Sequence, residues 1–93
     1  MKGEKRSRIQ ICFDVLWNLR EESKKNNKTC LTKVAHMANL PYDRFQKCLD
    51  NLIFIGMVSR VDNGEVLVTK KGTEFMDEYE KISDFLTRMG LLP

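Results

Sequence analysis

The chain of 93 residues has few of the residues that most often build catalytic and metal sites. It has one histidine, His36, with no serine or cysteine beside it in a recognisable nucleophile–base pattern. Its five glycines stand apart from one another at element ends, so the chain has no glycine-rich loop that would cradle a phosphate. The sequence therefore favours a protein that is not an enzyme and that holds no metal ion or other cofactor.

The three cysteines are odd in number and stand 18 residues apart, at Cys12, Cys30 and Cys48. Because no Cys-x-x-Cys pair is present, this spacing indicates neither a zinc site nor a disulfide framework. Cys12 and Cys48 fall on apolar faces of predicted helices, where a free cysteine packs as a small hydrophobic residue. We expect all three thiols to be reduced, with one disulfide as the alternative.

The chain also lacks any long uncharged run, with 42% hydrophobic and 31% charged residues, so no segment is expected to cross a membrane. The basic start of the chain is followed by Gln10, Asp14 and Asn18 rather than by a continuous apolar segment. This pattern does not fit a signal peptide. The sequence predicts a cytoplasmic protein.

Positive charge is unevenly distributed along the chain. Residues 1–71 carry 14 Lys and Arg against 8 Asp and Glu, a balance of +6, whereas residues 72–93 carry 2 against 5, a balance of −3. A localised positive field attracts a polyanion, which repels an acidic segment. Residues 1–7 are basic without periodicity and are expected to form a loose arm, either a solubilising tail or a contact to phosphate.

The segment 38–58 contains the most informative pattern. Its apolar residues lie three and four positions apart, which places them on one side of a helix, and the opposite side is polar. Pro41 suits the first helical turn and Gly56 the position just past the last, so we predict a helix over residues 41–55. The residues expected on its buried side are Phe45, Cys48, Leu49 and Leu52. Such a helix can lie in the major groove of DNA.

Two further helices are predicted before it, over residues 8–25 and 31–38. The first is expected to carry an apolar stripe of Ile9, Cys12, Phe13, Leu16 and Leu19. Ile11 and Val15 fall on a second apolar face, and Trp17, which also extends beyond the stripe, is expected to pack in the core or at an interface. The short second helix is joined to helix 41–55 through Asn39 and Leu40. Two helices with so short a connection fit a helix-turn-helix.

A β-hairpin is predicted directly after these helices. The β-prone runs 57–61 and 66–69 flank the sequence Asp62-Asn63-Gly64-Glu65, and Asn-Gly between such runs is a strong hairpin signal. A helix-turn-helix followed by a hairpin is a more specific signal for a winged-helix fold than either part alone. We therefore predict a mainly α fold with a small hairpin, a winged helix-turn-helix of three helices plus a wing over residues 8–69.

The last segment, residues 70–93, is predicted to form a helix over 70–89 with Thr69 as its N-cap. Its apolar residues follow a heptad spacing; those expected at an interface are Phe75, Tyr79, Ile82, Phe85, Leu86 and Met89. A helix of about 20 residues spans roughly 30 Å, more than so small a domain can cover. We expect a homodimer joined through a coiled coil of this helix, with folding back onto helix 8–25 as the alternative.

The predicted DNA contacts lie on helix 41–55 and around it. The residues expected to reach base edges are Arg44, Gln46 and Lys47, because Arg and Lys suit guanine and Gln suits adenine. Tyr42 and Asn51 are expected at the DNA backbone, and Asp43 is expected to cap the helix or accept from cytosine. The residues expected at phosphate or the adjacent minor groove are Lys28, Lys33, Arg60, Asn63 and Lys70.

Several short segments resemble archaeal winged-helix proteins, typified by the small basic DNA-binding proteins of Sulfolobus, and archaeal and viral winged-helix regulators. The matching residues are Ala38-Asn39-Leu40 with Tyr42, Leu49 and Leu52 with Gly56-Met57-Val58, and Leu67-Val68-Thr69-Lys70-Lys71-Gly72 with Phe75. The resemblance covers about residues 8–90. It implies a homodimer held by an antiparallel coiled coil, which presents two recognition helices to double-stranded DNA.

Three functions remain open from the residues. The first is a sequence-specific double-stranded DNA-binding protein that regulates transcription. The second is a non-specific architectural protein of the nucleoid, although the modest net charge of +3 disfavours it. The third is a winged helix that serves as a protein-interaction module. No small-molecule ligand is indicated.

Overall fold

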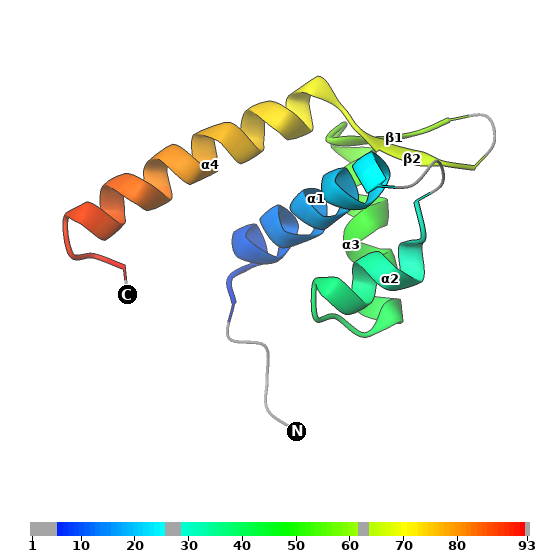
Figure 1. Cartoon of the computed structure of the whole chain (residues 1–93), viewed down its shortest axis with the longest axis horizontal. Coiled ribbons are helices and arrows are strands. Elements are labelled where there is room, and N and C mark those ends of the chain that lie inside the picture. The colour runs from blue at the N-terminus through cyan, green and yellow to red at the C-terminus, as the bar shows by residue number, and fades with distance from the viewer. Residues whose placement is uncertain (1–5, 26–28, 62–63, 93) are drawn as a thin grey trace.

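The computed structural model describes residues 6–25, 29–61 and 64–92. In these ranges the helices and strands are α1 (Arg8–Lys25), α2 (Leu31–Met37), α3 (Tyr42–Phe54), β1 (Val58–Arg60), β2 (Val66–Val68) and α4 (Lys70–Arg88). Figure 1 shows α1, α2, α3 and the hairpin packed together, while α4 leaves this body and ends far from it. The predicted order of three helices, a hairpin and a final helix is confirmed.

Helix α1 begins with reciprocal capping between Ser7 and Gln10. The Gln10 amide donates to Ser7 Oγ at 3.1 Å, and the Ser7 amide donates to Gln10 Oε1 at 2.8 Å. Each side chain therefore satisfies a backbone group at the helix start. Arg6, just before this cap, pairs with Asp14 and reaches the Asn39 carbonyl at 3.4 Å, so the chain is already packed against the domain at this point.

The buried face of α1 differs from the predicted stripe. Ile9 was expected in the core but is 56% exposed, because it lies in the first turn, outside the core cluster. The buried positions, which include the expected second face, are Ile11, Val15, Leu16, Leu19 and Glu22. The core thus takes Leu16 and Leu19 from the predicted stripe and Ile11 and Val15 from the second apolar face.

The turn between α2 and α3 contains Asn39 in the left-handed region, with φ of 59°. The Leu40 amide donates to the Ala35 carbonyl at 3.0 Å, which closes the end of α2 as in a Schellman motif. Pro41 has ψ of 147° and precedes α3 rather than occupying its first turn. Helix α3 is therefore one residue shorter at each end than predicted.

Strands β1 and β2 pair antiparallel, with Val58 opposite Val68 and Arg60 opposite Val66. Val58 and Val66 are buried, whereas Ser59 and Leu67 are exposed on the other face. The hairpin therefore covers the core with one side only. The predicted tip residue Asn63 lies outside the described residues.

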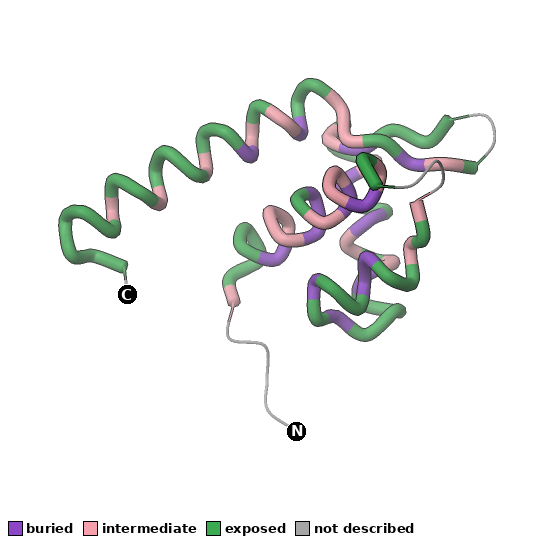
Figure 2. Tube along the Cα trace, in the orientation of Figure 1, coloured by how far each residue is buried: buried purple, intermediate pink, exposed green. Residues whose placement is uncertain are grey.

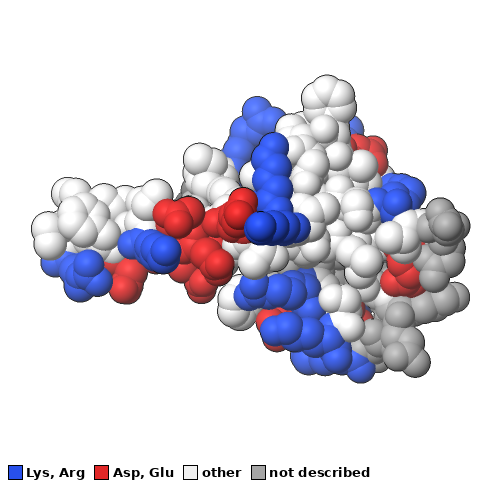
Figure 3. Space-filling view, turned by 90° about the horizontal axis from the view of Figure 1, so that it is seen from above, with Lys and Arg blue, Asp and Glu red and all other residues white. Residues whose placement is uncertain are grey.

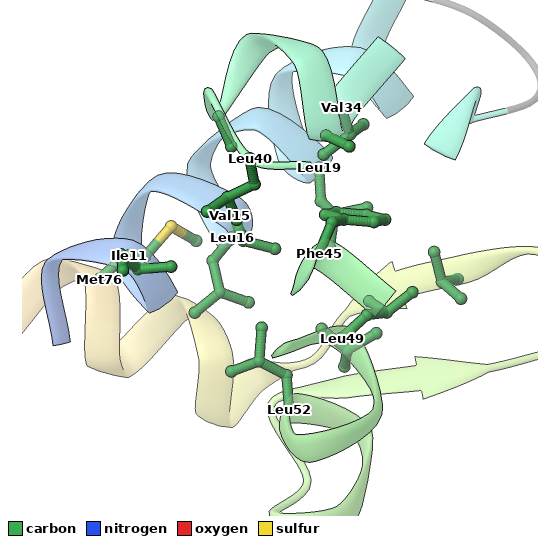
Figure 4. Close-up of a cluster of buried hydrophobic side chains, with 14 residues drawn as sticks. Ile11, Val15, Leu16, Leu19, Val34, Leu40, Phe45, Leu49, Leu52 and Met76 are labelled. Atoms are coloured by element: carbon green, nitrogen blue, oxygen red, sulfur yellow. The ribbon is translucent and has the colours of Figure 1, made fainter. Parts of the chain in front are cut away.

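One hydrophobic core joins these elements. Among the described residues, α1, α2, α3, both strands and α4 all contribute buried side chains to it (Figure 4). Phe45 and Leu49 of α3 belong to the same buried cluster as Leu16 and Leu19 of α1, and Met76 brings α4 into it. Within the described ranges, no helix has the length and hydrophobicity needed to span a bilayer.

The segment 69–72 joins the start of α4 to the end of α3. Thr69 Oγ1 accepts from the Gly72 amide at 3.2 Å, which confirms Thr69 as the N-cap, and it also donates to the Gly56 carbonyl at 2.6 Å. Lys71 Nζ donates to the Ile55 carbonyl at 2.6 Å. These bonds satisfy carbonyl groups that the end of α3 leaves unpaired. They hold α3, the hairpin and α4 in one arrangement.

Helix α4 is packed on the body through its first turns only. Within this fully described helix the buried residues are Gly72 and Met76, and Figure 2 shows the rest as partly or fully exposed. The Tyr79 ring stacks on Phe13 of α1 at 4.7 Å between centroids. The predicted seam is thus divided: Phe75 and Tyr79 pack within the chain, whereas Ile82, Phe85 and Met89 are at least half exposed.

Candidate nucleic-acid interface

Helix α3 turns its polar side to solvent. Arg44 and Lys47 are both exposed, and so are Asp43, Asp50 and Asn51. Arg44, Lys47 and Asn51 are spaced three and four residues apart, so they form one row along the helix. The buried residues Phe45, Leu49 and Leu52 anchor the opposite side of α3 in the core. The orientation required for groove insertion is therefore present.

This row borders a pocket between α3 and the first turns of α1. The pocket has a volume of about 400 Å³; its lining residues are Arg8, Ile11, Cys12, Leu40, Arg44, Lys47, Cys48 and Asn51. Three of these carry positive charge, and no carboxylate is among them. The arrangement suits a phosphate or the edge of a base, since both accept hydrogen bonds from cationic side chains.

Arg8 is the residue of this pocket that sequence reasoning missed. It lies 36 positions before Arg44, and the sequence analysis placed it at the start of helix 8–25 without assigning it a contact. Only the packing of α1 against α3 brings it beside Arg44 and Lys47. A basic residue at the start of a helix was the available signal, but it does not say which element the side chain will face.

Cys12 and Cys48 meet at this pocket, where both are half-buried and pack against the core, as expected. A hydrogen bond with Cys48 is the main cause that lowers the pKa of Cys12 from 9.0 to about 7; burial opposes it and Arg8 assists. The same hydrogen bond, followed by burial and by the charge on Cys12, raises the pKa of Cys48. Of the two thiols, Cys12 therefore loses its proton more readily, and Cys48 keeps its own.

Gln46 does not present its whole amide as predicted. Its Oε1 atom is buried and has no hydrogen-bond partner among the described residues. Gln46 also lies about 160° around the helix from Arg44 and about 140° from Asn51, away from the basic row. Reading adenine requires the amide oxygen and nitrogen together, so this conformation does not provide the bidentate contact.

Asp43 and Tyr42 stand at the start of α3. Pro41 precedes the helix, and no side-chain hydrogen bond caps it among the described residues, so the expected capping by Asp43 is not found. Asp43 lies in the first turn instead, where a negative charge is favoured by the helix dipole. The Tyr42 ring packs near Phe45, with 5.8 Å between centroids, and remains partly exposed.

Lys33 of α2 has a partner within the protein. Its Nζ lies 3.6 Å from Oε1 of Glu22, which is 1% exposed on α1. The sequence predicted that Lys33 contacts phosphate, but a buried carboxylate requires a nearby cation. Lys33 therefore helps to hold α2 on α1, and substitution there would change the fold's stability as well as any DNA contact.

The remaining predicted phosphate contacts flank α3. Arg60 on β1 and Lys70 at the start of α4 are exposed, whereas Lys28 and Asn63 lie outside the described residues. Figure 3 shows the largest group of acidic side chains over α4, and the larger groups of basic side chains, with smaller acidic groups, over the compact body. The charge separation that the sequence indicated is therefore a separation in space.

Phe54 is a second residue that the sequence did not identify as a candidate contact. It ends α3 and is 87% exposed, on the same outward side as Lys47 and Asp50.

A family model described as winged helix-turn-helix matches residues 5–87 of the chain. No curated protein matches this chain.

Proposed function

The chain belongs to the winged helix-turn-helix family, a family of DNA-binding proteins, and from this premise we propose that it binds double-stranded DNA in a sequence-specific manner and regulates transcription. Helix α3 enters the major groove and the hairpin lies on the adjacent backbone or minor groove. The observation that carries the proposal is the row Arg44, Lys47 and Asn51, exposed on a helix whose other side is locked in the core.

The two ends of this row have different roles in the proposed complex. Arg44 and Lys47 project from the first half of α3 and donate to guanine O6 and N7 in the groove. Arg8, across the pocket, donates to the phosphate that borders the groove, and Asn51 contacts the backbone. Arg60 of the wing binds a phosphate on the far side of α3, together with Lys70.

The acidic residues Asp43 and Asp50 favour sequence reading over uniform backbone binding. A carboxylate next to phosphate is repelled, but in the groove it accepts from the N4 amino group of cytosine. Phe54 offers an apolar contact to a thymine methyl. A purely architectural protein gains nothing from two exposed carboxylates on the inserted helix, because its affinity comes from neutralising phosphates.

Binding to a selected duplex should exceed binding to random duplex by ~10³-fold or more at physiological salt. With phosphate contacts from Arg8, Arg60 and Lys70, log Kd should change with log salt by a slope of about 3 per protomer. Fluorescence anisotropy after in vitro selection from a random library measures both. Equal affinity for all duplexes would favour the architectural function, and no salt-dependent binding at all would favour a protein-interaction module.

We propose that the exposed half of α4 is the surface that binds a second copy of the chain, which makes the protein a homodimer. Ile82, Phe85 and Met89 continue the heptad spacing beyond the last contact that α4 makes with its own body. A groove of about 560 Å³ between Phe13 of α1 and the polar residues Glu80, Lys81, Ser83, Asp84 and Thr87 of α4 is lined by none of these apolar side chains. The partner's α4 packs along Ile82, Phe85 and Met89 instead, in an antiparallel arrangement that places two α3 helices on one face of DNA.

Phe85→Asp should convert the dimer to a monomer, because it places a charge in the proposed seam at a side chain that is 50% exposed in the single chain. Sedimentation or light scattering at tens of micromolar measures the change. Lys81→Asp serves as the matched control, since it adds the same side chain at an already charged, exposed position. A wild-type protein that is monomeric under these conditions would contradict the dimer.

A further inference from the structure

Two thiols and three cations share the pocket between α1 and α3. Cys12 on α1 and Cys48 on α3 are both half-buried, line the same pocket and lie close enough for each to shift the pKa of the other. Arg8, Arg44 and Lys47 line the same pocket from both helices, and no carboxylate does so. The third cysteine, Cys30, is exposed just before α2 and does not line this pocket.

This setting favours the thiolate of Cys12. The Cys48 thiol donates a hydrogen bond to it, the Arg8 charge adds to this effect, and together they outweigh partial burial, so the pKa is about 7. The thiolate is the reactive form of cysteine, and reactive cysteines occur in electropositive, partly exposed surroundings. A buried structural cysteine would lack both the cations and the opening to solvent.

We propose that Cys12 and Cys48 form a redox-active dithiol that a hydroperoxide oxidises to an intramolecular disulfide between α1 and α3. The Cys12 thiolate attacks the terminal peroxide oxygen, the O–O bond breaks, and Cys12 becomes a sulfenic acid. The other oxygen leaves as hydroxide or, from an organic hydroperoxide, as alkoxide, and takes up a proton to give water or an alcohol. The Cys48 sulfur then attacks the sulfenic sulfur, loses its proton, and releases a second water. The two thiols lose two electrons, and the peroxide gains them.

The positions of Cys12 and Cys48 favour the second step, in which Cys48 attacks the sulfenic acid on Cys12. Because both thiols line one pocket between the packed helices α1 and α3, Cys48 reaches the sulfenic sulfur by a short approach within that pocket. The resulting bond ties the first turns of α1 to the middle of α3, directly below Arg44 and Lys47. Oxidation therefore acts on the same pocket that carries the proposed DNA contacts.

The test uses the reduced full chain without DNA, so its result does not depend on whether the protein binds DNA. After a stoichiometric amount of hydrogen peroxide and alkylation of free thiols, intact mass should give a monomer that has lost two hydrogens and keeps one alkylated cysteine. Peptide mapping should identify the cross-link as Cys12–Cys48. At pH 7, Cys12 should react roughly fivefold faster than an unperturbed thiol, since a larger thiolate fraction outweighs lower nucleophilicity.

Three variants separate the roles of the cysteines. Cys48→Ser should stop at a sulfenic acid on Cys12 that dimedone traps, Cys12→Ser should lose the fast reaction, and Cys30→Ser should behave as the wild type. Circular dichroism checks that each variant is folded, and mapping of the wild type does not depend on them. Oxidation of Cys30 as fast as Cys12, or a sulfenic acid on Cys12 that never bonds to Cys48, would overturn the proposal.

Discussion

Gly72→Ala is expected to lower the free energy of unfolding by about 3 kcal/mol, the upper part of the range for an overpacked site. A Cβ atom at position 72 would lie 2.4 Å from the Met57 carbonyl oxygen and 2.8 Å from Cγ1 of Val68. The first neighbour is backbone, so it cannot move aside as a flexible side chain would. The substitution must push the start of α4 away from the segment that joins α3 to the hairpin.

A loss of stability on Gly72→Ala would be opposite to the helix propensities of the two residue types. Gly72 lies in the first turn of α4, and in a helix interior alanine is favoured over glycine by about 1 kcal/mol. Urea unfolding followed by circular dichroism measures the difference. Two controls bracket it: Glu74→Ala, at an exposed position of the same helix, should change little, and Gly90→Ala tests a backbone of φ 80° with no atom in the way. A Gly72→Ala protein as stable as the wild type would contradict the close approach.

The double substitution Arg44→Ala, Lys47→Ala is expected to weaken binding to the preferred duplex by about 100-fold or more. Each base contact of this kind contributes about 1–3 kcal/mol of discrimination, which corresponds to roughly 5-fold to 150-fold in Kd. Both side chains are exposed, so the fold should be unaffected. Anisotropy titrations with selected and random duplexes measure the loss, which should be clearly larger on the selected duplex.

Arg60→Ala is the matched control for a phosphate contact. It should weaken binding to all duplexes alike and lower the salt slope by about 1, because it removes charge without removing base reading. Lys33 is unsuitable for this comparison, although the sequence suggested it, since its ammonium group lies 3.6 Å from the buried Glu22 carboxylate. Equal losses on selected and random duplexes from both sets of substitutions would contradict the division between base and phosphate contacts.

The helices and the hairpin were predictable because their signals are local. The period of apolar residues, Thr69 before α4, Gly56 after α3 and Asn-Gly in the hairpin act over a few positions along the chain. The bounds of α1 agree with the prediction and those of α3 differ by one residue at each end. The Ser7–Gln10 cap was equally readable, as Ser-x-x-Gln before an apolar run, but was not recognised.

The sequence by itself thus determined the order of elements, the outward polar side of α3 and the separation of basic and acidic parts. Tertiary structure alone decided that Arg8 joins Arg44, that Cys12 meets Cys48, that Lys33 pairs with Glu22 and that Gly72 leaves no room for a side chain. Each of these depends on how one helix is rotated and seated against another. That rotation is set by the fit of the whole core, so residues many positions apart share a site for reasons that no local pattern contains.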